Sequence, residues 1–551
     1  MKQFFYLILA ALVFNTSVSA QTADSVKALP KNWHQLDKAT TGYYGISLDK
    51  AYAFVKSKKL KSKTVLVAVI DSGIDTTQNE LKPVIWVNPK EIPGNGIDDD
   101  KNGHIDDMHG WNFIGGKDGR NVNSDSYEAA RVYYNLKPRF ENVPADSVFT
   151  NPSDSLQFVM YKKSKDKVTG GIDVDEVAFM QKFLPMFLAG DSSIKKDLKK
   201  DEYNCNDLEK YDPTTTDAKA TKSFLLTICK GNSSNDISNK DLIDEMQGEI
   251  RKADAATTPP EAFRKEIVQD DETNINDRDY GNSDVMAGTP FHGTHCSGII
   301  GAVSENGIGI NGIANNVRIM MVRAVPDGDE HDKDIANAIR YAVDNGAQII
   351  SMSFGKDFSP QKQWVDDAVR YAESKNVLLV HAAGNDAKDL DSTDNFPNPT
   401  YIDGKGRATN WITVGASGDP TNGGITASFS NYGKKEVDVF APGVQIYSTI
   451  PGAGGNNYGK ASGTSMATPV VAGTAAFLLE YFPDLTAQQL KYVIEKSAQD
   501  PGSVKIPGTD TSADMKELST SGGIINAYEA AKLASTLKGP KHCKHHCCKK
   551  K

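Results

Sequence analysis

The chain alternates short, unbroken apolar runs with amphipathic stretches. The first run, from Thr64 to Ile70, is apolar and rich in β-branched residues, which is typical of a strand buried on both faces of a parallel sheet. Similar short strands are predicted at residues 317–322, 348–353, 377–383 and 411–414.

Helical patterns lie between these strands. Four apolar residues recur at the spacing of one helix face, and Gly346 follows where that helix is expected to stop: Ile335, Ala338, Ile339 and Ala342. Another helical stretch closes at residues 371–372, before the strand at residue 377. This alternation predicts an α/β fold, with a doubly wound, mostly parallel sheet and helices on both of its faces.

Residues 118–280 interrupt the alternation. This segment is polar and rich in Lys and Asp, with scattered apolar positions at helical spacing, such as Val177, Met180 and Leu184. We interpret it as a partly helical insertion between two pieces of one domain, residues 40–117 and 281–535.

Both ends of the chain differ from the rest. Residues 1–20 combine a basic start, an apolar run of about eleven residues and small residues before position 21, a pattern that predicts a cleaved signal peptide. A short segment, 21–39, precedes the domain. The tail, 536–551, is rich in Lys, His and Cys, and is interpreted as an unstructured basic end or as a metal or redox site.

Composition narrows the classes of function. The 551 residues carry a net charge of -9, which argues against a general nucleic-acid binder. No segment after residue 20 is apolar enough to span a membrane. Of the six cysteines, Cys205 and Cys229 are free to pair in an oxidising compartment, and the sequence leaves that pairing open.

Three short motifs carry candidate chemistry. Asp71 follows the first buried strand, at the edge where open α/β sheets place their sites, although Asp-Ser-Gly is also an ordinary turn. His292 opens the stretch His-Gly-Thr-His-Cys-Ser-Gly, whose two histidines lack a third ligand at zinc spacing. Ser465 lies in Gly-Thr-Ser-Met-Ala-Thr-Pro, where Pro469 is expected in the first turn of a helix.

Together these motifs resemble those of the subtilisin family, in its chain order of Asp, His and Ser. The resemblance implies a serine endopeptidase that acts on proteins or peptides, with Asp71, His292 and Ser465 as the triad. It also implies that Asn385 lines the oxyanion hole. The segments that would hold substrate are Ser353, Phe354 and Gly355, and Ala383 and Gly384.

Calcium is the expected cofactor, and no organic cofactor is expected. Oxygen side chains alternate from residue 98 to 106 as in the first part of an EF-hand loop, although no Glu completes the pattern and an acidic turn is the alternative. The predicted ligands are Asp98, Asp100, Asn102, the carbonyl of His104, and Asp106. The resemblance suggests a second site at Glu80 and Asn306. The Gly-x-Gly-x-x-Gly of residues 307–312 lacks the context of a dinucleotide site, because it precedes a strand.

The sequence thus predicts an exported, monomeric endopeptidase located in the periplasm, at the cell surface or outside the cell. A catalytically silent homologue that binds peptides is the alternative, and a calcium-dependent adhesion protein is a third hypothesis. Casein hydrolysis that a fluorophosphonate abolishes would separate the first from the other two.

Overall fold

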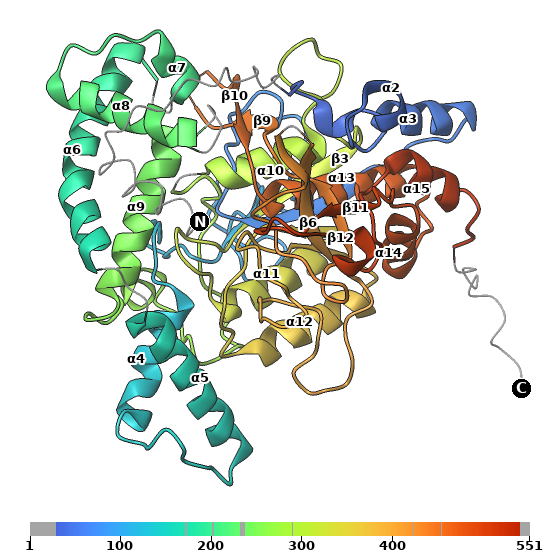
Figure 1. The fold of residues 1–551 in the computed structure, drawn as a ribbon. Coiled ribbons are helices and arrows are strands. Elements are labelled where there is room, and N and C mark those ends of the chain that lie inside the picture. Colours follow the sequence, from blue (N-terminus) through green and yellow to red (C-terminus); the bar gives the residue numbers. More distant parts are fainter. Residues whose placement is uncertain are drawn as a thin grey trace, which may run out of the picture. The chain divides into compact units, whose positions relative to one another are not determined.

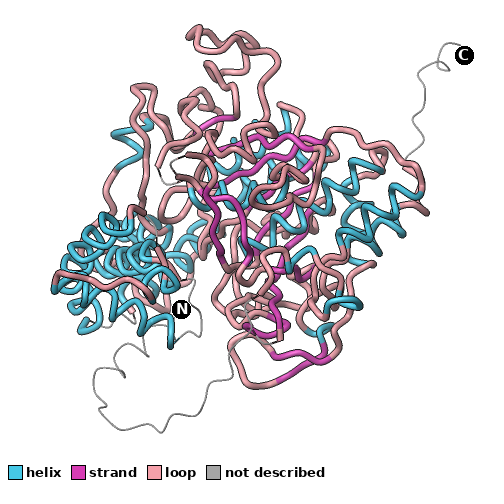
Figure 2. Tube along the Cα trace, turned by 90° about the horizontal axis from the view of Figure 1, so that it is seen from above, coloured by secondary structure: helices cyan, strands magenta, loops and turns pink. Residues whose placement is uncertain are grey.

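The computed structural model describes residues 29–539 except 171–173, 201–202, 232–236, 289, 421 and 453. The predicted signal peptide and residues 540–551 of the tail lie outside the described residues. The chain divides into two compact units, one of residues 125–261 and a larger one formed by the segments on either side of it. Figure 2 shows the strands gathered in the larger unit among its helices.

The larger unit is built on an eight-stranded sheet in the order β2-β3-β1-β4-β5-β6-β7, with β8 also paired to β6. All pairs are parallel except β6 with β7. The fold prediction is confirmed. The strands are β1 (Val65–Asp71), β2 (Gly110–Asn112), β3 (Val317–Arg323), β4 (Ile349–Met352), β5 (Leu378–Ala382), β6 (Trp411–Asp419), β7 (Asn422–Thr426) and β8 (Val439–Pro442). Two hairpins are separate from it, β9 (Ile446–Ile450) with β10 (Asn457–Ala461), and β11 (Ser503–Lys505) with β12 (Ser512–Asp514).

Successive residues of β1 enter two different cores, because side chains alternate between the faces of a strand. Val67 and Val69 lie in the core on one face, with residues of α10 (Phe291–Gly301) and α13 (Thr464–Tyr481). Ala68 and Ile70 lie in the core on the other face, with residues of α11 (Asp332–Asp344) and α12 (Lys362–Ser374). Figure 1 shows these two pairs of helices on opposite sides of the sheet. Burial on both faces explains why β1 is apolar throughout.

The helices of the larger unit are η1 (Trp33–Gln35), α2 (Lys38–Thr41), α3 (Leu48–Ser57), η2 (Arg264–Val268), α10 (Phe291–Gly301), α11 (Asp332–Asp344), α12 (Lys362–Ser374), α13 (Thr464–Tyr481), α14 (Ala487–Lys496), η3 (Met515–Glu517) and α15 (Ala527–Ala534). The placement of Pro469 in a first helical turn was wrong. Because α13 already begins at Thr464, Pro469 lies inside the helix.

The smaller unit is helical and has its own core. Its helices are α4 (Glu128–Phe140), α5 (Pro152–Thr169), α6 (Val174–Leu198), α7 (Cys205–Glu209), α8 (Thr216–Gly231) and α9 (Asn239–Asp254). Met180, Phe187 and Leu225 are buried together with Cys205 and Cys229. These two cysteines form a disulfide, which resolves the pairing that the sequence left open.

Residues 262–280, which we included in the insertion, belong to the larger unit. Arg264 forms a buried ion pair with Asp334 of α11 and a second one with Asp270. Lys333 of α11 also binds Asp270, at 2.5 Å, and the hydroxyl of Tyr280 donates to Asp334 at 2.7 Å. A charged side chain this deeply buried is stable only when it is paired. These contacts therefore fasten the segment to α11.

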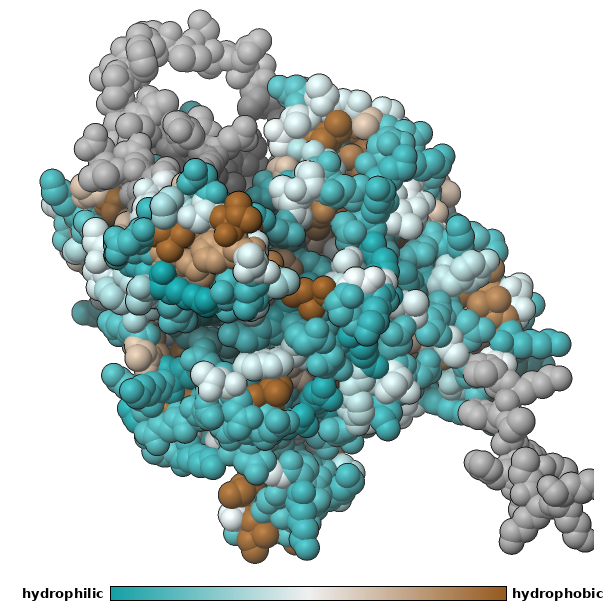
Figure 3. Space-filling view, turned by 90° about the horizontal axis from the view of Figure 1, so that it is seen from below, coloured by the Kyte–Doolittle hydropathy of each residue, from teal (hydrophilic) through white to brown (hydrophobic). Residues whose placement is uncertain are grey.

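The surface seen from below is mainly hydrophilic, with hydrophobic residues in small, separate groups (Figure 3). Exposed isoleucines occur in the segment of residues 91–107, which we call the acidic loop, at Ile92, Ile97 and Ile105. Within the described residues, no helix combines the length and the apolar character that crossing a bilayer requires.

Candidate active site

Asp71 and His292 meet at the edge of the sheet where its parallel strands end. Asp71 is the last residue of β1, and His292 lies in the first turn of α10. Nδ1 of His292 is 2.8 Å from Oδ1 of Asp71. The same oxygen accepts the N–H of Ser72 at 2.7 Å. Asp71 is buried and His292 is half-buried, so the imidazole is partly open to solvent while its Nδ1 edge is held by a carboxylate.

The pKa of His292 is raised above its ordinary value. Burial pushes the pKa down, but the negative charge of Asp71 and its hydrogen bond push it up by more. The hydrogen bond also holds the ring in one orientation, with Nε2 available on the opposite edge.

Ser465 is the second residue of α13, which follows the Gly463 turn. Its hydroxyl donates to the backbone carbonyl of Ser353 at 3.2 Å, just past the end of β4. Among the described contacts, this hydroxyl is therefore directed to the β4 segment rather than to His292. Its backbone N–H belongs to the N-terminal turn of the helix, where N–H groups have no helical partner and attract negative charge.

Asn385 follows β5 and is oriented by Thr464. Its Oδ1 accepts both the backbone N–H of Thr464, at 2.9 Å, and the Thr464 hydroxyl, at 3.0 Å. Because both donors meet Oδ1, the NH2 group of Asn385 faces the other way. A Cβ added to Gly463 would lie 3.5 Å from Nδ2 of Asn385 and 3.5 Å from the N of Ser465. The NH2 group of Asn385 and the N–H of Ser465 thus lie near one point beside the Ser465 side chain. Nothing in the sequence indicated that Thr464 orients Asn385.

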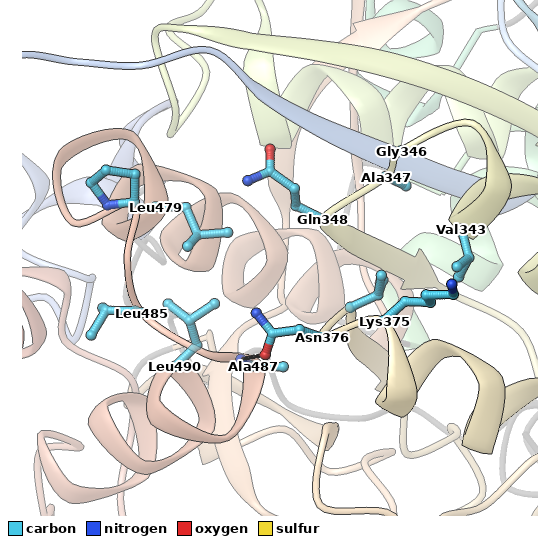
Figure 4. Close-up of a pocket in the computed structure, with 12 residues that line it drawn as sticks. Val343, Gly346, Ala347, Gln348, Lys375, Asn376, Leu479, Leu485, Ala487 and Leu490 are labelled. Atoms are coloured by element: carbon cyan, nitrogen blue, oxygen red, sulfur yellow. Dashed lines mark hydrogen bonds between the residues drawn. The ribbon is translucent and has the colours of Figure 1, made fainter. Parts of the chain in front are cut away.

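The predicted substrate segments follow two adjacent parallel strands of the sheet. Ser353, Phe354 and Gly355 follow β4, and Ala383 and Gly384 follow the neighbouring strand β5. Their place at the carboxyl ends of adjacent parallel strands agrees with where open α/β sheets bind ligands. A pocket of about 310 Å³ lies elsewhere, where β4 and β5 begin (Figure 4). Leu479, Leu485 and Leu490 line it.

Cys296 lies on the helix of His292 and is fully buried. One candidate ligand atom from each of Asp71, His292 and Cys296 lies within 4.8 Å of the other two. The sulfur donates to the carbonyl of Ser465 at 3.4 Å. Burial, followed by the nearby charge of Asp71, raises the pKa of the Cys296 thiol, so the sulfur stays protonated. His295 is also buried, and its Nε2 is 3.3 Å from the carbonyl of Gly459.

The acidic loop brings together only part of the predicted calcium set. Asp98 and Asp100 meet Glu91, with one carboxylate oxygen from each within 4.8 Å of the others. Glu91 is buried and was missed because it precedes the repeating pattern. The carboxylate of Asp106 is instead bound to the N–H groups of Asn95 and Gly96.

Of the two other predicted ligands, Asn102 makes contacts within the loop, and the ring of His104 is separate from the carbonyl that was predicted to bind. The side chain of Asn102 accepts the N–H of His104 through Oδ1, at 2.8 Å, and donates to Asp107, at 3.0 Å. The ring of His104 is buried against Trp111, and burial lowers its pKa to about 4. Its backbone carbonyl, the group named in the prediction, stays a predicted ligand.

Glu80 and Asn306 are in contact, but through a donor. Nδ2 of Asn306 donates to Oε1 of Glu80 at 3.2 Å, and the N–H of Ile310 donates to Oε2 at 3.3 Å. These two hydrogen bonds hold the 306–310 turn against Glu80, and a calcium site there stays a prediction.

Comparison with known proteins gives one family match, to the Subtilase family over residues 62–516. A thermophilic serine proteinase of Bacillus sp. (strain AK1) is 40% identical over 255 residues, which are 46% of this chain and 54% of that protein. Thermitase of Thermoactinomyces vulgaris is 38% identical over 241 residues, 43% of this chain and 74% of that protein. The chain thus spans about half the length of the first relative and about three quarters of the second.

Solved structures also match. A protease from Pseudoalteromonas arctica is 19% identical with a TM-score of 0.44, over 92% of this chain and 97% of that one. The protease domain of PatA is 29% identical with a TM-score of 0.36, over 45% of this chain and 81% of that one.

Proposed function

Because this chain belongs to the subtilase family, we propose that Asp71, His292 and Ser465 form the catalytic triad of an exported serine endopeptidase. Residues 62–516 are a subtilisin-like serine endopeptidase domain. The observation that carries the proposal is the 2.8 Å hydrogen bond between Asp71 and His292, at the strand edge that also holds Ser465 and Asn385. Proteins or peptides are the substrates of such a site.

The chemistry follows from the roles of the three side chains. The Ser465 hydroxyl is a weak nucleophile, so Nε2 of His292 takes its proton as Oγ attacks the scissile carbonyl carbon. The C–N bond then breaks, the same proton passes to the leaving amine, and an acyl ester remains on Ser465. Water attacks this ester in the same way and releases the acid. Asp71 fixes the ring and stabilises its charged form, which agrees with the raised pKa of His292.

The hydroxyl must turn before it can react. Its present acceptor is the carbonyl of Ser353. Rotation about one side-chain bond exchanges that acceptor for His292, and such rotations are fast on the timescale of catalysis. The Ser353–Gly355 segment is then free to hold the backbone of the substrate.

Negative charge develops on the carbonyl oxygen during the attack. The NH2 group of Asn385 and the N–H of Ser465 are the donors that stabilise it. Thr464 restrains the amide before substrate arrives, because two hydrogen bonds hold its oxygen. A donor that is already oriented needs no reorganisation during the reaction.

Ser465→Ala tests the nucleophile. We expect no casein hydrolysis and no labelling by a fluorophosphonate, with an unchanged melting temperature. Ser462→Ala is the matched control, since that hydroxyl is exposed and accepts the N–H of Gln445. Casein cleavage by Ser465→Ala at the wild-type rate would refute the assignment.

Calcium is proposed at Glu91, Asp98 and Asp100. Three carboxylates close together repel one another unless a cation neutralises them, and oxygen ligands suit calcium. All three carboxylates of this set also accept backbone N–H groups of the loop, so the loop is folded around them. The ion would serve stability rather than catalysis.

A further inference from the structure

Asn431 lies in the segment between β7 and β8 and is 1% exposed. Its NH2 group donates to the carbonyl of Ala383 at 2.8 Å. Its Oδ1 accepts the N–H of Asp386, at 3.1 Å, and the N–H of Lys388, at 2.8 Å. Its backbone N–H donates to the carbonyl of Gly384 at 2.8 Å.

These four hydrogen bonds bracket Asn385. Two of them end on the residues before Asn385, at 383 and 384, and two end on residues after it, at 386 and 388. From this geometry we infer that Asn431 is a positioning residue, which holds the 383–388 loop so that the amide of Asn385 meets the developing oxyanion. The inference rests on the proposed oxyanion role of Asn385.

Close contact supports the same role. Gly384 has a φ of +98°, and a Cβ there would lie 2.5 Å from Nδ2 of Asn431. The Asn431 amide thus packs directly against the loop backbone, and only a glycine leaves the necessary space. On the other side, Asn431 is anchored to the sheet, because the Ser430 hydroxyl donates to its carbonyl and accepts the N–H of Ala416 in β6.

The two restraints on Asn385 are complementary. Thr464 holds its side-chain oxygen, whereas Asn431 holds the backbone on either side of it. Neither restraint replaces the other, because a correct side-chain rotamer on a displaced backbone still misses the oxyanion. Small displacements of catalytic groups cost much of the rate.

The loop has other anchors, so loss of Asn431 should not unfold it. The N–H of Ala387 donates to the carbonyl of Phe429 at 2.8 Å, and the N–H of Tyr432 donates to the carbonyl of Lys388 at 3.0 Å. These backbone bonds do not involve the Asn431 side chain. Replacing Asn431 should therefore loosen the loop rather than detach it.

The test is a double-mutant cycle of Asn431→Ala and Asn385→Ala in the full chain. A small chromogenic peptide is the substrate, and active sites are counted with a fluorophosphonate so that unfolded protein does not enter kcat. Asn431→Ala should lower kcat about tenfold and change KM less than about twofold, since the misplaced donor acts mainly in the transition state. In the Asn385→Ala background it should lower kcat less than about twofold, because the group it positions is gone.

Asn410→Ala is the matched control. Asn410 is equally buried and donates to a backbone carbonyl, that of Val377, at 2.7 Å, but it lies where β5 begins, at the opposite end of that strand. It should lower the melting temperature about as much as Asn431→Ala while leaving kcat within about twofold. Asn431→Ser, a smaller change, provides a second variant if Asn431→Ala cannot be purified folded.

The outcomes separate the inference from the function on which it rests. An equal loss of kcat from Asn431→Ala in both backgrounds, or no loss in either, would overturn the positioning role. An unchanged kcat for Asn385→Ala alone would overturn the oxyanion role itself. Loss in the wild-type background only, with KM preserved, is the result expected of a positioning residue.

Discussion

Pro469 lies four residues after Ser465 in α13, and it has no N–H to give to the Ser465 carbonyl. That carbonyl instead accepts the hydroxyl of Ser353 at 3.0 Å and the thiol of Cys296 at 3.4 Å. The Ser465 carbonyl, which has no hydrogen-bond donor at position 469 of the helix, thus links α13 to the end of β4 and to α10. These two hydrogen bonds connect Ser465, the proposed nucleophile, to the proposed substrate segment 353–355 and to the helix that carries His292.

The thiol of Cys296 should make the enzyme sensitive to mercurials. A mercury adduct on this buried sulfur would displace His292 or the Ser465 carbonyl, which both lie beside it. We expect inhibition of the wild type, and an active, resistant Cys296→Val variant, because a buried free cysteine packs as a small hydrophobe. Initial rates after mercurial treatment measure the effect.

Other cysteines require a control. Cys205 and Cys229 are joined in a disulfide, and Cys296 is the free cysteine of the described residues. A variant with serine at Cys543, Cys547 and Cys548 should remain as sensitive as the wild type. Equal sensitivity of Cys296→Val would place the reacting group elsewhere.

Calcium should stabilise the protein through the acidic loop. Binding to the folded state alone raises the melting temperature with the logarithm of the ion concentration, and we expect a difference of about several degrees between excess calcium and chelator. Asp100→Ala and Glu91→Gln should abolish that difference.

Asp106→Asn distinguishes the structure from the sequence pattern. The carboxylate of Asp106 holds the 95–96 turn and lies outside the acidic cluster, so this change should leave the calcium-dependent difference intact. Identical melts of the wild type with calcium and with chelator would remove the calcium proposal.

Glu480 should make stability fall as pH rises. It is fully buried in α13, where burial raises its pKa to about 7 from an ordinary 4.5. Below pH 4.5 the group is protonated both folded and unfolded, and contributes no difference. Between pH 4.5 and 7 only the unfolded chain releases the proton, which lowers the free energy of unfolding by about 3 kcal/mol in total.

Glu480→Gln removes this dependence and keeps an oxygen to accept the N–H of Asn316, which now binds Oε1 at 2.7 Å. Urea unfolding at several pH values provides the measurement. The variant should match the wild type near pH 4 and be more stable at pH 8. A difference that does not change with pH would contradict the raised pKa.

The part of the insertion that forms the smaller compact unit, residues 125–261, should be dispensable for peptide-bond cleavage. Replacement of residues 125–261 by a Gly/Ser linker should leave hydrolysis of a small chromogenic peptide within a few-fold of the wild type. The unit contains none of the proposed catalytic residues.

Replacement of residues 125–270 should give a protein that is much less stable or does not fold. It removes Arg264 and Asp270, and leaves Lys333 and Asp334 buried without those partners, at a cost of about 3–5 kcal/mol. Soluble yield and melting temperature compare the two deletions. Equal stability would contradict the structural role of the ion pairs, and folded but inactive protein from the shorter deletion would show that the insertion helps to build the site.

The sheet and the candidate triad could both be predicted from the order of amino acids, because both leave short local patterns in the chain. Unbroken apolar runs arise where a strand is buried on two faces, and β1 to β6 lie where those runs predict them, apart from the three-residue β2. Asp71, His292 and Ser465 stand in short motifs whose residue types and chain order are readable without coordinates. Their mutual geometry follows once the parallel strands end at one edge.

Which distant residues support that site could be seen only in the folded chain. Asn431 stands 46 positions after Asn385, and its four bonds to the loop have no sequence pattern. Glu91 joins the acidic cluster from outside the repeating motif, whereas Asp106, inside the motif, turns away. The boundary of the insertion moved for the same reason, since Arg264 is polar in sequence but buried by its pairing with Asp334. Hydrophobic periodicity records burial of apolar surface, and a buried polar side chain is specified by partners that only the folded chain brings near.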